Sequence, residues 1–575
     1  MIRRMRAVAL VLVAALALSG CSSSNSTGSS DSSGGGAKPS PQAELKPVAK
    51  ATGKEDPHIH ADINSVTVSG GMTTINFTVY NDKAEKGIGG HWQVADRFAT
   101  EDYVAPVDDQ GNTAEDHSFA NHESTNGVKL EDPDSKTVYR PAYDSAMRCL
   151  CSTDLATVLI PQGGQAVLYA SYAPLPEGVD KVTVTFPGFD PVENVPVTRD
   201  KPAAAVTAKS PTDQHVLASR STVADVQKAT VELNSVIDAN GSTFVSWSVT
   251  NNDDSRIQVS DAFSSGRYES AVDESGGSGD SHGDVANGVV LVDGANRHAY
   301  HVAYDKSEDC LCSDDLSAAF ISPGQTVTFF ATFAQLPEGT DSVAVHIPTA
   351  GVFDNVPVTR VGDRASPSED SKGSGDPRVP KVGIVAPRLD TILVTSTDDD
   401  ASTTTRLPGG VRTTLAGDVN FEVDSDQLTD RARQILDGLA EEWSDEPPEA
   451  VTIIGHTDSV ADDAHNLDLS KRRAQAVADY LGGKVPGLDI AVDGKGESQP
   501  VADESGDNVD AARAANRRVE ITAKTSSSST DGPFSPTGGE DGDGEPDGRD
   551  GSGNPSGASS PDNGASSTSG SGSGD

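Results

Sequence analysis

The chain has 575 residues, of which 87 are aspartate or glutamate and 44 are lysine or arginine, so its formal net charge is -43. Only 35% of the residues are hydrophobic and 5% aromatic, too few for packing throughout a chain of this length. The composition therefore predicts a few modest cores separated by solvated segments. Its acidity argues against nucleic acid and anionic lipid headgroups as partners.

The N-terminus has the pattern of an export signal. Three arginines precede an apolar run from Ala7 to Leu18, which is too short to span a bilayer unaided. The residues Leu18-Ser19-Gly20-Cys21 resemble a bacterial lipoprotein lipobox, in which cleavage leaves a lipidated cysteine. The resemblance implies a signal peptide at 1–20 and an extracytoplasmic protein anchored to a membrane by acyl chains on Cys21. An ordinary secretory signal and an uncleaved anchor helix are the alternatives. Whether the membrane is an outer membrane or the cell membrane stays open.

Four segments of low complexity divide the rest of the chain. They are rich in small and polar residues, so they cannot bury enough apolar surface to offset their chain entropy. We expect a disordered tether at 21–56, linkers at 200–222 and 362–410, and a disordered acidic tail at 525–575.

Two units between these segments are copies of each other. Residues 142–178 align without gaps with 303–339, and the sequence NVPVTR closes both units. Short runs within each unit alternate polar and apolar residues, and turn residues separate the runs. The pattern predicts two tandem all-β sandwich repeats, at 57–199 and 223–361. The number and spacing of the strands suggest an immunoglobulin-like topology.

Each repeat carries a Cys-Leu-Cys-Ser motif, with Cys149 and Cys151 in the first and Cys310 and Cys312 in the second. Cysteines two apart can just satisfy the separation that a disulfide needs, and the exterior is oxidising, so we expect a disulfide within each pair. A Cu(I) site is an alternative, because Met147 precedes the first pair. A redox-active pair is another, although thiol oxidoreductase motifs place two residues between the cysteines.

The pattern changes after the second linker. Strand-like runs now alternate with amphipathic helical ones, which is typical of an α/β layer. We expect strands at 414–424, 450–454, 489–494 and 517–522, and helices at 427–443, at 463–481 and near Asp510.

One helical stretch contains a residue that does not suit its position. Leu469, Arg473, Val477 and Leu481 share one face of the helix, so a guanidinium that cannot lose its proton falls within an apolar stripe. Asp458 follows the strand at 450–454, at the end of a strand where sites in α/β sheets form. A carboxylate beside a guanidinium complements a zwitterion, which offers an ammonium group to one and a carboxylate to the other. The alternative is a structural salt bridge between the two.

Three blocks of this region, GHTDSVADDAHNLDLSKRRAQAV, GKGESQPVADE and ANRRVEI, resemble the peptidoglycan-binding domain shared by outer-membrane protein A and the peptidoglycan-associated lipoprotein. The resemblance covers residues 411–524. It implies that Asp458 and Arg473 bind the free end of diaminopimelic acid in the peptide stem of peptidoglycan. By the same resemblance, further pocket positions fall to Thr457, Asn466, Leu469, Phe421 and Asp424.

Three positions depart from the family pattern. Ala461 stands where the family usually has glycine, His465 where it has an aromatic residue, and Glu422 where an aspartate is usual. An alanine forced to a positive φ costs about 1 kcal/mol, so we expect a different path for the loop around Ala461. The run 516–520, NRRVE, is expected to be structural, as a strand whose charged residues cap the end of the sheet.

Other kinds of site find little support. No nucleophile elbow, phosphate-binding glycine loop or supported pair of catalytic carboxylates is present, so we expect no catalytic residues, no cofactor and no enzyme. Histidines gather in the first repeat but lack matched spacing, so we expect no metal site among them: His58, His60, His91, His117 and His122.

Together these features predict a membrane-anchored lipoprotein that binds peptidoglycan non-covalently and tethers the cell envelope to the wall. The β repeats would act as a spacer or as a docking surface for an unknown protein partner. The alternative is an extracellular ligand-binding receptor or adhesin whose β repeats are the working part. Its C-terminal domain would then only retain it at the wall.

Overall fold

The computed structural model describes residues 46–82, 91–99, 123–208, 217–224, 227–239, 241–259, 262–264, 285–305, 309–361, 387–422, 424–445, 447–505 and 509–524. The predicted signal peptide, Cys21, most of the tether and the tail lie outside these residues, as do His117 and His122. No helix in the described part of the chain is both long and apolar enough to cross a membrane.

The first repeat has two layers of strands around one core. One layer contains β1 (Ala49–Thr52), β2 (Ile59–Ser69), β3 (Met72–Asn81) and β8 (Gly164–Tyr172), and the other contains β5 (Lys129–Glu131), β6 (Thr137–Asp144), β9 (Lys181–Thr185) and β10 (Val192–Arg199). Strand β10 joins the two layers at one side, because it starts antiparallel to β9 and ends parallel to β2, and β6 joins them at the other by pairing with β8. Seven strands therefore close into a barrel, in place of the open sandwich that was predicted: β2, β3, β8, β6, β5, β9 and β10. Three phenylalanines pack together inside: Phe77, Phe98 and Phe186. Two short strands, β4 (His91–Gln93) and β7 (Leu159–Pro161), pair beside this core.

The second repeat pairs its strands in the same way. Strands β12 (Ala218–Ala224), β13 (Gln227–Ala239), β14 (Ser242–Asn251) and β19 (Thr326–Ala334) form one layer, and β16 (Val290–Asp293), β17 (His298–Tyr300), β20 (Ser342–Ile347) and β21 (Gly351–Pro357) the other. Strand β22 (Thr359–Val361) runs parallel to β13, as the end of β10 does beside β2. The short strands β15 (Ile257–Gln258) and β18 (Phe320–Ile321) match β4 and β7. The prediction of two mostly β repeats is confirmed, whereas the immunoglobulin-like topology stays a prediction.

Each cysteine pair is bonded within its own motif, Cys149 to Cys151 and Cys310 to Cys312. The two rings take equivalent places: Cys149 and Cys310 form bridges to Tyr143 and Tyr304, and the second cysteine of each pair bridges to β8 or β19. The bonding is the disulfide expected for each pair, and the backbone bridges join each motif to the neighbouring strand. In the described residues, no group of three or more His, Cys, Asp or Glu side chains is placed to hold a metal ion.

The linker and tether predictions are wrong in part. Strands β23 (Arg388–Thr397) and β24 (Ser402–Leu407) lie within 362–410, β11 (Val206–Ala208) and the start of β12 lie within 200–222, and β1 lies within the predicted tether. Strand β23 pairs with β6, β17 and β24. Its apolar residues Ile392, Leu393 and Val394 join the core of the first repeat. Composition conceals such strands, because they are threonine-rich and because two partners of β23, β6 and β17, lie far along the chain.

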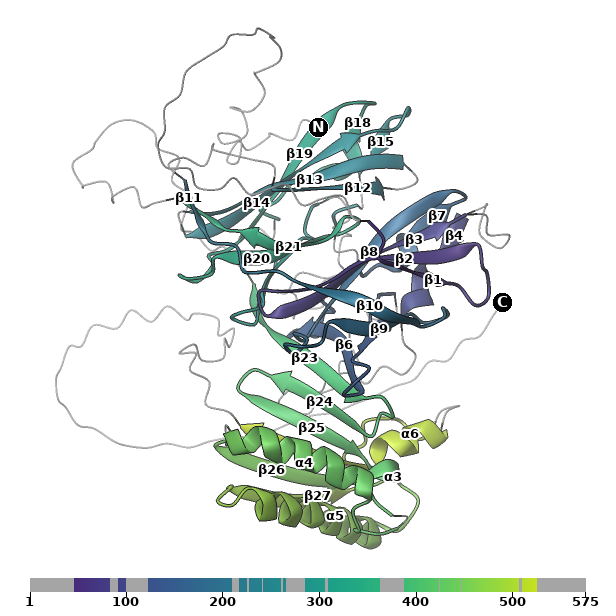
Figure 1. Cartoon of the computed structure of the whole chain (residues 1–575), viewed down its shortest axis with the longest axis vertical. Helices are drawn as coiled ribbons and strands as arrows, with labels where there is room; N and C mark the ends of the chain where they lie inside the picture. Colours follow the sequence, from purple (N-terminus) through teal and green to yellow (C-terminus); the bar gives the residue numbers. More distant parts are fainter. Residues whose placement is uncertain are drawn as a thin grey trace, which may run out of the picture. The chain divides into compact units, whose positions relative to one another are not determined.

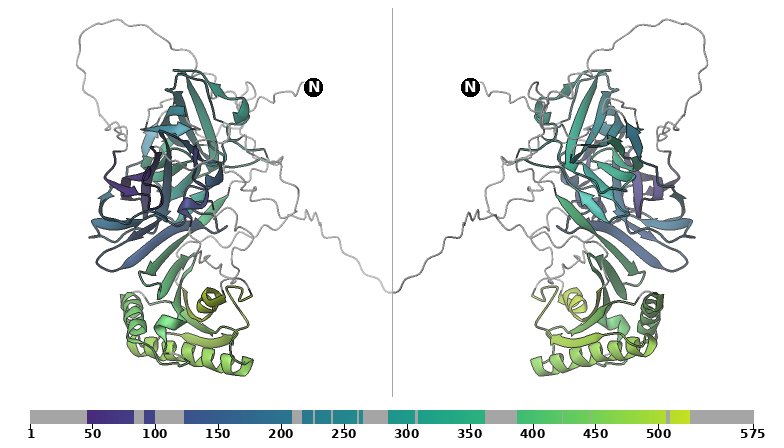
Figure 2. Two further views of the ribbon diagram at one scale, coloured as in Figure 1. Left: turned by 90° about the vertical axis from the view of Figure 1, so that its right-hand side faces the viewer. Right: turned by 90° about the vertical axis from the view of Figure 1, so that its left-hand side faces the viewer.

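The C-terminal part is an α/β domain (Figure 1, Figure 2). Its sheet has the order β25 (Gly410–Ala416), β28 (Arg518–Lys524), β26 (Ala450–His456) and β27 (Ile490–Gly496), of which only β26 and β27 are parallel neighbours. Helices α4 (Asp430–Asp445) and α5 (Asp463–Lys484) pack on it through a core that includes Leu436, Val477 and Leu481. The remaining helices are α3 (Gly417–Asn420) and α6 (Val509–Asn516).

The predicted strand at 414–424 is wrong beyond Ala416, where α3 begins. Gly417 comes so close to the neighbouring chain that a Cβ would lie 2.6 Å from the carbonyl oxygen of Arg517. Its N–H donates to that same oxygen, so β25 ends in a tight turn. The other predicted elements of the domain are confirmed, with ends shifted by a few residues.

Candidate functional site

A glycine brings the two main residues of the predicted site to one end of the sheet. A Cβ at Gly455, near the end of β26, would lie 2.0 Å from the carbonyl oxygen of Ser470 in α5, so only glycine allows this contact. Asp458 follows the strand at this point, and Arg473 lies in α5 less than one turn beyond Ser470. The contact between β26 and α5 thus places Asp458 and Arg473 at the same end of the sheet.

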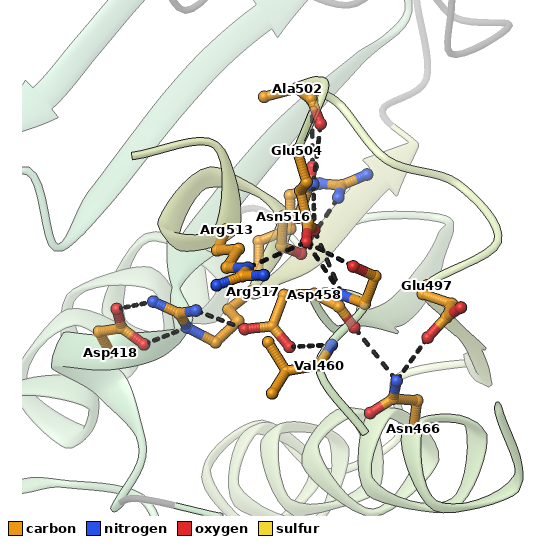
Figure 3. A network of polar contacts seen from close by, with 12 residues as sticks. Asp418, Asp458, Val460, Asn466, Glu497, Ala502, Glu504, Arg513, Asn516 and Arg517 are labelled. Atoms are coloured by element: carbon orange, nitrogen blue, oxygen red, sulfur yellow. Dashed lines mark hydrogen bonds and ion pairs between the residues drawn. The ribbon is translucent and has the colours of Figure 1, made fainter. Parts of the chain in front are cut away.

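The carboxylate of Asp458 is held from the β28 side (Figure 3). Arg517 donates from Nη1 to Asp458 Oδ2 at 2.5 Å, and it forms a two-point pair with Asp418 at 2.6 and 2.5 Å. The backbone N–H of Val460 donates to Asp458 Oδ1 at 3.3 Å. The hydrogen bonds to Asp418, together with the one to Asp458, raise the pKa of the Arg517 guanidinium. One oxygen of Asp458 is therefore occupied by a permanent cation, and the other has a single weak donor.

The guanidinium of Arg473 is buried but only partly occupied. Its Nε donates to the carbonyl oxygen of Ser425 at 2.9 Å, and its central carbon lies 5.1 Å from the ring centre of Phe421. Neither Nη atom has a hydrogen-bond partner within the described residues. Burial lowers the pKa of Arg473, and the nearby carboxylates, led by Asp418 and Asp424, oppose this shift. An arginine keeps its charge under such conditions. The two Nη atoms are therefore a charged fork that the described chain leaves open.

Asp458 and Arg473 are not paired with each other in the part of the chain that the structure describes. Asp458 is bonded to Arg517, and Arg473 to Ser425. The alternative of a structural salt bridge between them is therefore wrong. Each has its own support, so both can face a common ligand.

The other predicted residues have different surroundings. Thr457 is 4% exposed, and its Oγ1 has no hydrogen-bond partner within the described residues. Asn466 donates from Nδ2 to the carbonyl oxygens of Asp458 and Ala461 and to Glu497, so it shapes the loop before α5. Leu469 is buried. Phe421 packs against Arg473, whereas the exposed Asp424 lies 3.0 Å from His465.

The loop around Ala461 takes a path without the expected strain. Ala461 has no positive φ, whereas Asp424 has a φ of 50°. The side chain of Asp462 accepts from the N–H of His465 and begins α5 as an N-cap. The absence of the usual glycine is thus accommodated by the backbone.

The contact between Arg517 and Asp458 was not expected, because the run NRRVE was interpreted as structural. Arg517 immediately precedes β28, whose Val519 lies opposite Gly455 of β26. Glu504 also anchors the loop, because its carboxylate accepts hydrogen bonds from Ser459, Asn516 and Arg513 (Figure 3). The third block of the resemblance contained the signal, since it ends in β28, which pairs with β26, the strand that Asp458 follows.

His456 lies beneath the site. Its ring is 2% exposed, and both ring nitrogens lack a hydrogen-bond partner within the described residues. Burial, helped by Arg518 and opposed by Glu520, lowers its pKa to about 4. The ring is thus neutral near pH 7.

Comparisons with known proteins concern this domain. Residues 420–527 match the model of the OmpA family. The outer membrane protein A of Shimwellia blattae is 40% identical over 120 residues, which cover 19% of this chain and 50% of that protein. The protein of the same name from Citrobacter freundii is 39% identical over 120 residues, with the same coverage. The chain therefore spans about half the length of these relatives.

Two solved structures are similar to the same part of the chain. The peptidoglycan-associated lipoprotein from Burkholderia pseudomallei is 30% identical, with a TM-score of 0.17, and the match covers 18% of this chain and 86% of that one. The cell wall anchor of the T6SS from Pseudomonas aeruginosa is 28% identical, with a TM-score of 0.20, covering 22% and 90%. On the family match, this chain carries an OmpA family domain at residues 420–527.

Proposed function

We propose that the C-terminal domain binds peptidoglycan without cleaving it, through the zwitterionic end of diaminopimelate in the peptide stem. The observation that carries the proposal is the open fork of Arg473, buried and held by one nitrogen, near a carboxylate fixed by another arginine. The OmpA family match supports it, because the resemblance implies this ligand.

The geometry suits a ligand that carries both charges. Its carboxylate would accept two hydrogen bonds from the Nη atoms of Arg473, and its ammonium group would donate to Asp458. The protein has already removed Arg473 from bulk water, so the ligand gains a charge-assisted contact without a further cost for burying the arginine. Binding then relies on preorganisation rather than on a large contact area.

For the whole chain, we propose a link between membrane and wall in the cell envelope. The acyl chains on Cys21 would hold one end in the membrane, and the C-terminal domain would hold peptidoglycan. The β repeats, with the immunoglobulin-like topology expected from their strands, would separate the two ends or receive a protein partner. No step of this activity requires catalysis or a cofactor.

The test is co-sedimentation of the soluble chain from residue 22 onward with purified cell-wall sacculi. We expect preference for sacculi of the diaminopimelate type over the lysine type, and about a hundredfold weaker binding for Arg473→Ala. Arg433→Ala is the matched control, because Arg433 is an exposed arginine of α4 that pairs with Asp430. Equal sedimentation with both types of sacculi would contradict the assigned ligand.

A further inference from the structure

Three consecutive residues of the loop before α4 are each joined to α5. Asp424 Oδ1 lies 3.0 Å from His465 Nε2, the carbonyl oxygen of Ser425 accepts from Arg473 Nε at 2.9 Å, and Asp426 Oδ1 lies 3.2 Å from Arg472 Nη1. We call Asp424–Asp426 the clasp. Its central contact is the hydrogen bond that orients the open fork of Arg473, and the described residues supply no other to this guanidinium.

The loop that contains the clasp also makes contacts within itself, in addition to those with α5. Ser425 donates its N–H to the carbonyl oxygen of Glu422, Glu422 donates its own to that of Gln427, and Phe421 forms a bridge with Leu428. The loop that supplies the Ser425 carbonyl therefore also supplies the ring beneath Arg473. A shift of this loop would move both supports of the guanidinium.

The two flanking contacts add to the backbone contacts within the loop and hold it against α5. They differ from the central contact in being exposed: the side chains of His465 and Asp424 are 41% and 66% accessible, and those of Arg472 and Asp426 are 41% and 42%. Exposed pairs are individually weak, so the loop depends on both. Asp424 also has a positive φ, which aspartate tolerates better than most residues but does not favour.

We propose that the clasp positions Arg473 for an anionic group of the ligand, with His465 and Arg472 as the positioning residues. The inference rests on the proposed function for the identity of that group, a carboxylate of the peptide stem. The two halves of the site are then set by separate segments: Arg517 fixes Asp458 from the β28 side, and the clasp fixes Arg473 from the loop before α4. His465 does this with a residue type that departs from the family pattern.

The experiment uses three variants of the soluble full chain: Asp426→Ala, His465→Phe and the double variant that carries both. Each is compared with a control variant, Asp468→Ala. Asp468 is the matched control, because it is the other partner of Arg472, at 2.8 Å, and lies outside the clasp. We expect three- to tenfold weaker binding to diaminopimelate-type sacculi for each single clasp variant and about thirtyfold or more for the pair. Asp468→Ala should stay within twofold, and His465→Gln, whose amide can still donate to Asp424, should recover most of the loss caused by His465→Phe.

A second measurement separates positioning from general stability. The Nε–H of Arg473 is protected by the Ser425 carbonyl, so its hydrogen exchange, followed by nitrogen-15 NMR, should accelerate at least tenfold in the double clasp variant and remain unchanged in Asp468→Ala. Unchanged exchange and unchanged binding in the double variant would overturn the clasp. If the wild-type chain fails to bind sacculi while the exchange accelerates as expected, the clasp stands and the proposed ligand fails.

Discussion

Two arginines at the site differ in which of their nitrogens the chain itself occupies. Arg517 donates hydrogen bonds to Asp418 and Asp458 from all three of its guanidinium nitrogens, whereas Arg473 donates to the described chain only from Nε. The position of Arg473 in an apolar helical stripe could be recognised from the sequence, because a charge there has few structural uses. Arg517 could not, since charged residues beside a strand are usually solvated and its partner Asp418 lies in a helix where a strand was expected.

At the residue scale, Arg517→Gln should weaken both folding and binding. The substitution removes the charged partner of Asp458 and Asp418, so we expect the free energy of unfolding to fall by about 1 to 3 kcal/mol. Affinity for sacculi should fall at least tenfold, because Asp458 can then turn away from the ligand. Arg433→Gln, at an exposed arginine of α4 whose partner is Asp430, is the control for urea unfolding and sedimentation. Wild-type affinity in Arg517→Gln would show that binding does not need a fixed Asp458.

At the scale of elements, periodicity predicted the helices of the C-terminal domain well. The apolar stripe of 463–481 became α5, and the predicted helix at 427–443 became α4 at Asp430–Asp445. The strand predicted at 414–424 failed because a close approach at Gly417 ends it, and periodicity does not detect a contact between distant backbones. Strand β23 was missed for a related reason, since two of its three partners are about 90 and 250 residues away.

The close contact between β26 and α5 leads to a prediction at Gly455. Gly455→Ala should destabilise the domain by about 3 kcal/mol, because the added methyl group meets backbone that cannot move aside. It should also abolish binding, since α5 would shift with Arg473.

Gly438→Ala should have the opposite effect. Gly438 lies in α4 with nothing near its Cβ position, so the alanine should stabilise the domain by about 0.5 to 1 kcal/mol. Urea unfolding measures the free energy of unfolding of both variants. Equal values for Gly455→Ala and Gly438→Ala would contradict the close contact at Gly455.

At the scale of the molecule, the internal repeat was visible in the sequence but the contacts between its copies were not. Thr74 and Asn76 lie on the polar side of an alternating run, where residues are expected to face solvent. Both are buried instead, because Thr74 donates to Asp354 and Asn76 exchanges hydrogen bonds with the backbone of Val352 in the second repeat. Alternation predicts two faces of a strand but does not show what covers the polar one.

Buried ionisable groups at this junction predict that acid weakens the protein. Burial lowers the pKa of His346, which lies 3.3 Å from Ser171 of the first repeat, to about 3. Burial also lowers the pKa of His301, and Arg148 adds to the effect while Asp144, 2.8 Å from its Nε2, opposes it. For buried Asp144, burial alone would raise the pKa, but Arg148 and His301 hold it below its usual value.

All three groups have a lowered pKa in the folded protein, so each makes the free energy of unfolding fall as the pH falls. An imidazole whose folded pKa lies below the ordinary value near 6.5 stabilises the fold above that pH, and its contribution is lost as the pH falls. Asp144 adds a loss below about pH 4. We expect His346 alone to cost about 2 kcal/mol of unfolding free energy between pH 7.5 and 5. Urea unfolding at both pH values measures it, and His346→Gln should have a correspondingly smaller difference. An identical difference in both proteins would refute this assignment.

Strand β23 has a mechanical consequence. In one run of 10 residues it hydrogen-bonds to β6 of the first repeat, to β17 of the second, and to β24, which in turn pairs with β25 of the C-terminal domain. If the C-terminal domain were pulled while bound to peptidoglycan, the force would act on the backbone hydrogen bonds of β23. Pulling on the C-terminal domain would therefore have to break hydrogen bonds to both repeats before β23 could separate from them.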